Sequence, residues 1–216
     1  MIPPVVLLDE LERDALTELV NIGVSRAAAN LRKMVGAQVL LSVPAVEVVT
    51  RDHATALIRE RENGELVAVR QDFSGAFSGR ALLIFPQANS MALVHAVTGG
   101  VLSAEDATDM EGEALAETGN VVLNSCLATM ANMLNRPLTM SLPEVIRGDG
   151  LQLFTLAPEA PAETAPGAVV LFLYINFAIN DRDIRGYIAM LMDLPSLHAL
   201  KLLVGDFIER VIGNDA

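Results

Sequence analysis

The hydrophobic pattern of this chain begins with one long amphipathic helix. Apolar residues recur at helical spacing from Leu16 to Met34. Asp9 precedes this run, and Glu12 lies three residues after Asp9. Such a pair is typical of a capping box at a helix start. Gly36 stands just beyond the last periodic position, where helices commonly end. The pattern therefore predicts a helix between Asp9 and Gly36.

Strand-like segments and a second helix follow. Residues 39–49 are rich in β-branched side chains but are interrupted by Pro44, and further strands are predicted at residues 66–73 and 80–85. The Ser- and Gly-rich stretch between these two strands indicates a turn. A helical pattern then covers residues 87–97 and is closed by a pair of glycines.

The second half of the chain repeats this plan. A long helix is predicted at about residues 110–134, followed by strands at about 138–142, 169–177 and 184–192 and by a final helix after Pro195. Residues 157–167 are rich in Pro, Ala and Glu and have no counterpart in the first half. We expect them to form a solvated loop.

A shift of 99 residues aligns the two halves. Nine positions between residues 14 and 46 then match identically: Ala15/Ala114, Leu16/Leu115, Glu18/Glu117, Asn21/Asn120, Ala29/Ala128, Met34/Met133, Ser42/Ser141, Pro44/Pro143 and Val46/Val145. Similarity at a fixed spacing indicates a repeated structural unit. We therefore expect a single domain, residues 1–216, made of two half-repeats at about 9–100 and 108–212.

Two of the repeated polar positions are not explained by packing. Glu18 with Asn21, and Glu117 with Asn120, lie three residues apart on the predicted long helices, so their Cβ atoms are about 5–6 Å apart on one face. A single Glu-x-x-Asn on a helix is usually an exposed surface pair, and helix interiors do not favour Asn. Its recurrence in register in otherwise diverged halves favours a functional interpretation.

A carboxylate beside a carboxamide suits work on another protein. The Glu can hold a cationic group, while the amide can donate to one group and accept from a water, fixing that water for attack. Hydrolysis of a phosphoryl group needs this division of labour when the metal and the phosphate belong to the partner. The three histidines, His53, His95 and His198, are scattered, and no metal site is expected in the chain itself.

The composition excludes several classes of partner. A net charge of −12 opposes binding to nucleic acid or to an anionic membrane. The sequence has no phosphate-binding Gly-rich Lys loop, no Gly-x-Ser-x-Gly elbow and no Cys or His pair at metal spacing. Cys126, the one cysteine, lies in an apolar helical run and is expected to be a buried structural thiol. The start of the chain lacks a basic secretion signal, and we expect a cytoplasmic protein.

The first repeat resembles the CheC, CheX and FliY phosphatase family. The pattern of that family is Asp or Ser, three residues, Glu, two residues, Asn, twenty-two residues, Pro. Asp14, Glu18, Asn21 and Pro44 fit it at every spacing. The αββ(β)α half-repeat is also the unit of that family, so the resemblance covers most of the chain.

The second repeat fits the same pattern with one departure. Glu117, Asn120 and Pro143 match, whereas Glu113 replaces the Asp or Ser. In the first repeat Val20 stands where a Gly often precedes the Asn, and we expect it to narrow the approach of a partner to that site. Both sites are expected to act.

The resemblance implies an α+β fold, in which a pseudo-twofold duplicated half-repeat forms a mostly antiparallel sheet with two long signature helices and additional packing helices. It implies a phosphatase that hydrolyses the aspartyl phosphate of a chemotaxis response regulator. Glu18 and Glu117 would pair with a receiver lysine, and Asn21 and Asn120 would aim the attacking water. The chain would need no cofactor of its own, since the CheY-like receiver would bring Mg²⁺.

Other interpretations stay open. The chain can be a non-catalytic module of the same fold that binds a receiver, or a scaffold whose chief partner is a CheD-like receptor deamidase. Two signatures in one chain favour a CheC-like over a CheX-like member. The chain ends soon after its second half, so we expect no additional C-terminal domain of the FliY kind.

Overall fold

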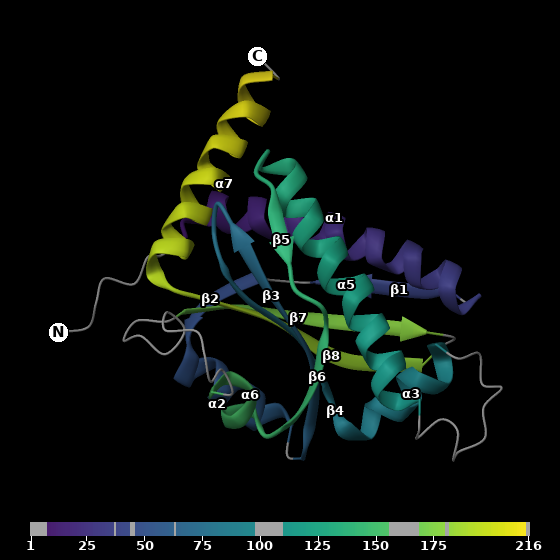
Figure 1. Ribbon diagram of the computed structural model, residues 1–216. Helices are drawn as coiled ribbons and strands as arrows, with labels where there is room; N and C mark the ends of the chain where they lie inside the picture. Colours follow the sequence, from purple (N-terminus) through teal and green to yellow (C-terminus); the bar gives the residue numbers. More distant parts are fainter. Residues whose placement is uncertain are drawn as a thin grey trace.

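The computed structural model describes residues 8–36, 38–43, 46–62, 64–97, 110–155, 169–179 and 182–214 (Figure 1). The first half contains α1 (Glu10–Val35), β1 (Val39–Ser42), β2 (Val46–Thr50), α2 (Arg51–Arg61), β3 (Leu66–Gly75), β4 (Gly79–Pro86) and α3 (Gln87–Val97). The second half contains α5 (Glu111–Met133), β5 (Leu138–Met140), β6 (Glu144–Gly148), α6 (Gly150–Thr155), β7 (Val169–Ile179), β8 (Arg182–Met192) and α7 (Leu194–Asn214). The order of helices and strands is thus the same in both halves.

One curled antiparallel sheet joins the two halves. Its strand order is β1-β7-β8-β4-β3-β5, and β2 and β6 pair additionally with β7 and β3. The first two strands of each half therefore pair with a strand of the other half, while β4 and β8 pair at the centre. The predicted fold class, an α+β duplication built on a mostly antiparallel sheet, is confirmed.

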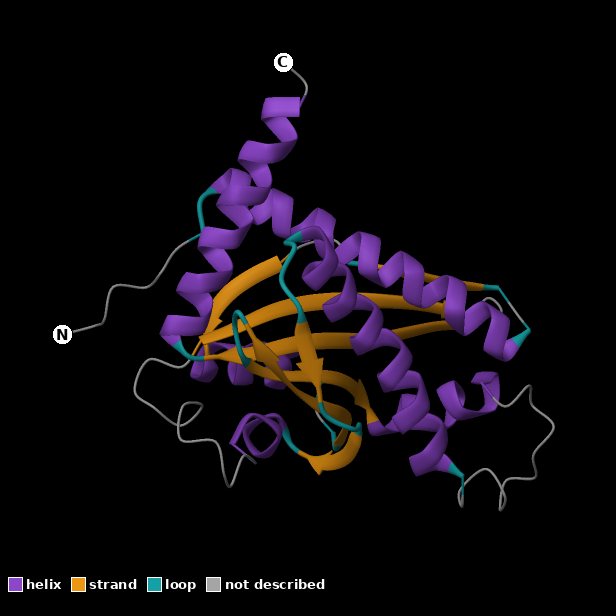
Figure 2. Ribbon diagram, turned by 45° about the horizontal axis from the view of Figure 1, so that its top comes forward, coloured by secondary structure: helices purple, strands orange, loops and turns teal. Residues whose placement is uncertain are grey.

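Helices cover both faces of this sheet and create two hydrophobic cores. The larger core lies between the sheet and α1, α3, α5 and α7, and the smaller one lies beneath α2 and α6. Figure 2 shows the long helices lying across one face of the curled sheet. The two signature helices therefore sit side by side on the same face.

Local signals fix the ends of α1. The Asp9 side chain accepts from the backbone N–H of Glu12, and the Glu12 carboxylate accepts from the backbone N–H of Asp9, both at 2.8 Å. Gly36 ends the helix in the left-handed conformation, with φ at 65°, which glycine adopts without steric cost. The helix predicted between Asp9 and Gly36 is confirmed.

A glycine lets α1 and α5 approach closely. A Cβ atom at Gly23 would lie 2.7 Å from the Cα atom of Cys126 on α5. Cys126 is fully buried, and burial raises the pKa of its thiol to about 12. The interpretation of Cys126 as a buried structural thiol is confirmed.

Three elements differ from the sequence prediction. Helix α2 was not expected, because its polar composition leaves only Ala54, Thr55 and Ile58 buried. Strand β6 and the one-and-a-half-turn helix α6 were also not expected, since both are short. Pro44 and the whole predicted loop at 157–167 lie outside the described residues.

Candidate functional site

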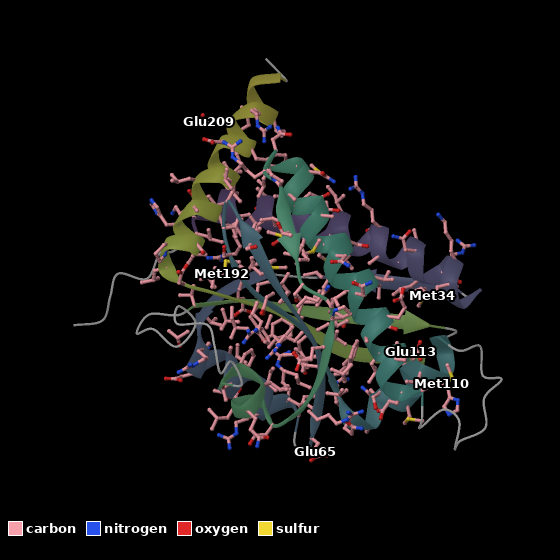
Figure 3. All side chains as sticks on the ribbon, in the orientation of Figure 1. Met34, Glu65, Met110, Glu113, Met192 and Glu209 are labelled. Atoms are coloured by element: carbon pink, nitrogen blue, oxygen red, sulfur yellow. The ribbon has the colours of Figure 1, made fainter. Side chains whose placement is uncertain are left out.

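The carboxylates of both signature pairs face solvent. Glu18 on α1 and Glu117 on α5 are exposed, as are Asp14 and Glu113 one turn earlier. Within the described part of the chain, neither Glu18 nor Glu117 has a hydrogen-bond or ion-pair partner. Figure 3 labels Glu113 near the start of α5. These acidic groups are therefore available to a cation on another molecule.

The side chain of Asn21 is occupied by the backbone. Its Nδ2 donates to the carbonyl of Val43, and its Oδ1 accepts from the N–H of Val43, both at 3.0 Å. Val43 is 2% exposed and follows β1 directly. Asn21 thus ties the residue between β1 and β2 to α1 and uses both ends of its amide to do so.

Asn120 makes different contacts. Its Oδ1 accepts from Gln71 Nε2 at 3.3 Å and from Asn124 Nδ2 at 2.5 Å. Gln71 Nε2 also donates to the carbonyl of Ser141 at 2.9 Å. The Nδ2 group of Asn120 has no hydrogen-bond acceptor among the residues that the structure describes. Its two N–H donors are therefore available.

The loop beside Asn120 is also arranged differently. Leu142 is the repeat counterpart of Val43, yet it is 89% exposed. The preceding Ser141 is fixed to β3, because its N–H donates to the carbonyl of Asp72 and its Oγ accepts from the N–H of Asp72, both at 2.9 Å. Ser141 thus ties the loop of residues 141–143 to β3.

The expected role of Val20 is wrong. Val20 has 0% exposure and packs in the large core, so it cannot narrow the approach of a partner. At the counterpart position, a Cβ atom on Gly119 would overlap the side chain of Val69 on β3. The glycine at this position therefore serves close packing of α5 against the sheet.

Gln71 and Asn124 were missed by sequence reasoning. Gln71 is 1% exposed in the middle of β3, and Asn124 lies one turn after Asn120. The sequence around Gln71 carried little signal, because Arg70 and Asp72 flank it and the burial of one side chain among three polar residues cannot be read from the pattern. The partner of Gln71 belongs to another element, which the sequence does not reveal.

The described residues contain no group of three His, Cys, Asp or Glu side chains placed to hold a metal ion. Within those same ranges, no helix combines the length and the apolar character needed to cross a bilayer.

Comparisons with known proteins find chemotaxis phosphatases. Residues 67–161 match the family described as "Chemotaxis phosphatase CheX". The flagellar motor switch phosphatase FliY of Bacillus subtilis is 27% identical over 146 residues, which are 67% of this chain and 38% of FliY. CheC1 of Halobacterium salinarum, a protein named for CheY-P phosphatase activity, is 24% identical over 146 residues, which are 67% of this chain and 73% of CheC1.

The fold is likewise shared. The structure of Thermotoga maritima FliY superposes with a TM-score of 0.72 at 19% identity, covering 94% of this chain and 99% of that one. The matched segment spans little over a third of the length of the B. subtilis protein. The family match, the relatives and the fold all show that this chain is similar to the chemotaxis phosphatases of the CheX and CheC kind.

Proposed function

We propose that this chain hydrolyses the aspartyl phosphate of a phosphorylated CheY-like response regulator. The observation that carries the proposal is the pair of solvent-facing carboxylates, Glu18 and Glu117. Each lies three residues before an Asn, on the first helix of each of the two repeats. The names of the FliY and CheC1 relatives support the same activity. Such a reaction belongs in the cytoplasm, where we expect the protein to act.

The roles follow from the chemistry of the side chains. Glu18 and Glu117 pair with a lysine of the receiver, and the amides of Asn21 and Asn120 hold the attacking water in line with the phosphorus. The chain supplies no cofactor, and Mg²⁺ comes with the receiver. Catalysis is then a matter of positioning, as it is in other phosphoryl transfers.

A second function has one observation in its favour. Because the amide of Asn21 is engaged by Val43, the first site can grip a receiver through Glu18 without holding a water. A chain that used both sites in this way would be a docking module for a receiver, or a scaffold for a CheD-like deamidase. Catalysis distinguishes these functions from the phosphatase.

The test is release of phosphate from a purified, acetyl-phosphate-labelled CheY-like receiver. We expect wild type to accelerate release, and the Asn21→Ala/Asn120→Ala double variant to lose that acceleration. Asn30→Ala on α1 and Asn132→Ala on α5 are matched controls, because both residues are exposed and lie outside the pairs. If the double variant is as active as wild type, the mechanism is wrong. If wild type binds the receiver without accelerating release, the docking function is correct.

A further inference from the structure

The two sites are not equivalent, and the difference arises from how each repeat holds its loop. In the first repeat, Asn21 itself binds the backbone of Val43. In the second repeat, Gln71 and Asp72 of β3 bind the backbone and side chain of Ser141. The loop after the first strand is therefore held by the helix in the first repeat and by β3 in the second.

Resting on the phosphatase function, we propose that the Glu117/Asn120 site carries most of the hydrolysis and that Gln71 is the residue that positions Asn120. Gln71 donates to Asn120 Oδ1 and, together with Asn124, holds that oxygen towards β3. The NH₂ group of Asn120 consequently points away from these partners. It can donate to the attacking water or to a phosphoryl oxygen without breaking an existing bond.

The strand registers identify the counterpart of Gln71. On β3, Gln71 lies midway between Phe73, which pairs with β5, and Val69, which pairs with β6. On β7, Ile175 lies midway between Phe177, which pairs with β1, and Leu173, which pairs with β2. The partners on those four strands are again 99 residues apart: Phe73–Met140 and Val69–Val145 correspond to Phe177–Leu41 and Leu173–Val46. Ile175 therefore occupies the place of Gln71 in the first repeat.

This comparison separates fold from function at Gln71. Ile175 and Gln71 are each 1% exposed, so the same place in the fold accepts an apolar side chain. A buried amide is unfavourable unless it is fully hydrogen-bonded. Gln71 Oε1 is buried and has no hydrogen-bond partner among the described residues. An amide kept at this cost is not needed for packing, and its hydrogen bonds to Ser141 and to Asn120 supply the reason.

The first site lacks this arrangement. The Ile175 side chain has no donor for Asn21, and both ends of the Asn21 amide are bonded to Val43. After these bonds Asn21 Nδ2 has one N–H left for a water, whereas both N–H groups of Asn120 lack an acceptor among the described residues. The first site thus offers fewer unoccupied donors than the second, and its amide is held to the backbone of Val43.

The test compares single variants and one double-mutant cycle in the phosphate-release assay. We expect Asn120→Ala to lower kcat by about tenfold more than Asn21→Ala does, with Asn132→Ala and Asn30→Ala as controls. Gln71→Met keeps the size of the side chain and removes the donor, and should lower kcat about tenfold with KM unchanged. In the Asn120→Ala background, Gln71→Met should cause no further loss, because Gln71 acts through Asn120.

The outcomes separate the two proposals. If wild type accelerates release but Asn21→Ala is as damaging as Asn120→Ala, the inequality of the sites is wrong and the phosphatase function stands. An equal loss from Gln71→Met in both backgrounds would show a merely structural role for Gln71. If wild type has no activity, both proposals fail. If Gln71→Met folds poorly, Gln71→Ile, which places the side chain of the first repeat in the second, replaces it in the assay. The NMR resonances of the Asn120 side-chain NH₂ group in the receiver-free protein then report whether Gln71 positions that amide.

Discussion

The side-chain amide of Asn21 and the backbone of Val43 form a closed pair of hydrogen bonds, each 3.0 Å long. The pair joins α1 to the residue that follows β1, across 22 residues of sequence. An Asn in this position therefore supports the fold whether or not it contacts a partner. Its contribution to stability can be measured separately from its contribution to activity.

We predict that Asn21→Ala destabilises the protein. Because Val43 is buried, the variant leaves its N–H and carbonyl without partners, which should lower the free energy of unfolding by about 1–3 kcal/mol. Urea unfolding of the variant, wild type and Asn30→Ala measures this difference. Asn30 is exposed on the same helix, so its replacement should have little effect. Equal stability of all three proteins would show that the two hydrogen bonds between Asn21 and Val43 do not stabilise the fold.

The crossing of α1 and α5 gives a second prediction. Gly23→Ala would place a Cβ atom 2.7 Å from the backbone of Cys126 and force the helices apart, which should cost about 1–3 kcal/mol. Gly205→Ala on α7 is the matched control, because no atom lies within 4 Å of its added Cβ. The control should gain up to about 1 kcal/mol from better helix propensity. Thermal unfolding checks the opposite signs, and a stabilised Gly23→Ala would refute the close crossing.

Burial of Cys126 makes stability depend on alkaline pH. Its pKa is raised from 9.0 to about 12 because burial disfavours the thiolate, so above pH 9 the unfolded chain binds fewer protons at this group than the folded one. Stability must then decrease as the pH rises from 9 towards 12. Burial also raises the pKa of Tyr174 and Tyr187, so the measured quantity is the difference in slope between wild type and Cys126→Ala.

A chemical experiment tests the same thiol. At pH 8 the thiolate of folded Cys126 is only about one part in ten thousand, and the folded protein should resist a thiol-specific reagent. Full labelling in denaturant provides the control. Rapid labelling of the native protein would show that the crossing of α1 and α5 opens readily.

The sequence predicted the elements whose signals are local. The capping box of Asp9 and Glu12 and the terminal Gly36 defined α1, and apolar strand patterns defined β3, β4, β7 and β8. Helix α2 was missed because most of its residues are exposed and polar, so its short apolar stripe is weak. Local propensity is informative where a long segment is amphipathic and fails where tertiary packing stabilises a short one.

The residues of the site could be predicted from the sequence, but their hydrogen-bond partners could not. The spacing of Glu117 and Asn120 followed from the repeat, because the period of a helix is known. That Gln71 would reach Asn120 depends on which strand lies beneath α5, and sequence alone does not determine that pairing. For the same reason, the burial of Val20 and the hydrogen bonds between Asn21 and Val43 could not be foreseen.

The exposed Leu142 gives the last prediction, which rests on the proposed phosphatase function. Leu142 is 89% exposed in the loop that Ser141 fixes to β3, and Gln71 bonds both Ser141 and Asn120, so Leu142 suits an apolar contact with a receiver docked at that site. Leu142→Asp should therefore raise KM for the phosphorylated receiver several-fold, about 1 kcal/mol of binding, with kcat nearly unchanged. Its stability should match wild type, since the side chain is in water in the free protein. The counterpart Val43→Asp buries a charge at 2% exposure and should instead unfold the protein. An unchanged KM for Leu142→Asp would show that the receiver approaches Asn120 without touching this loop.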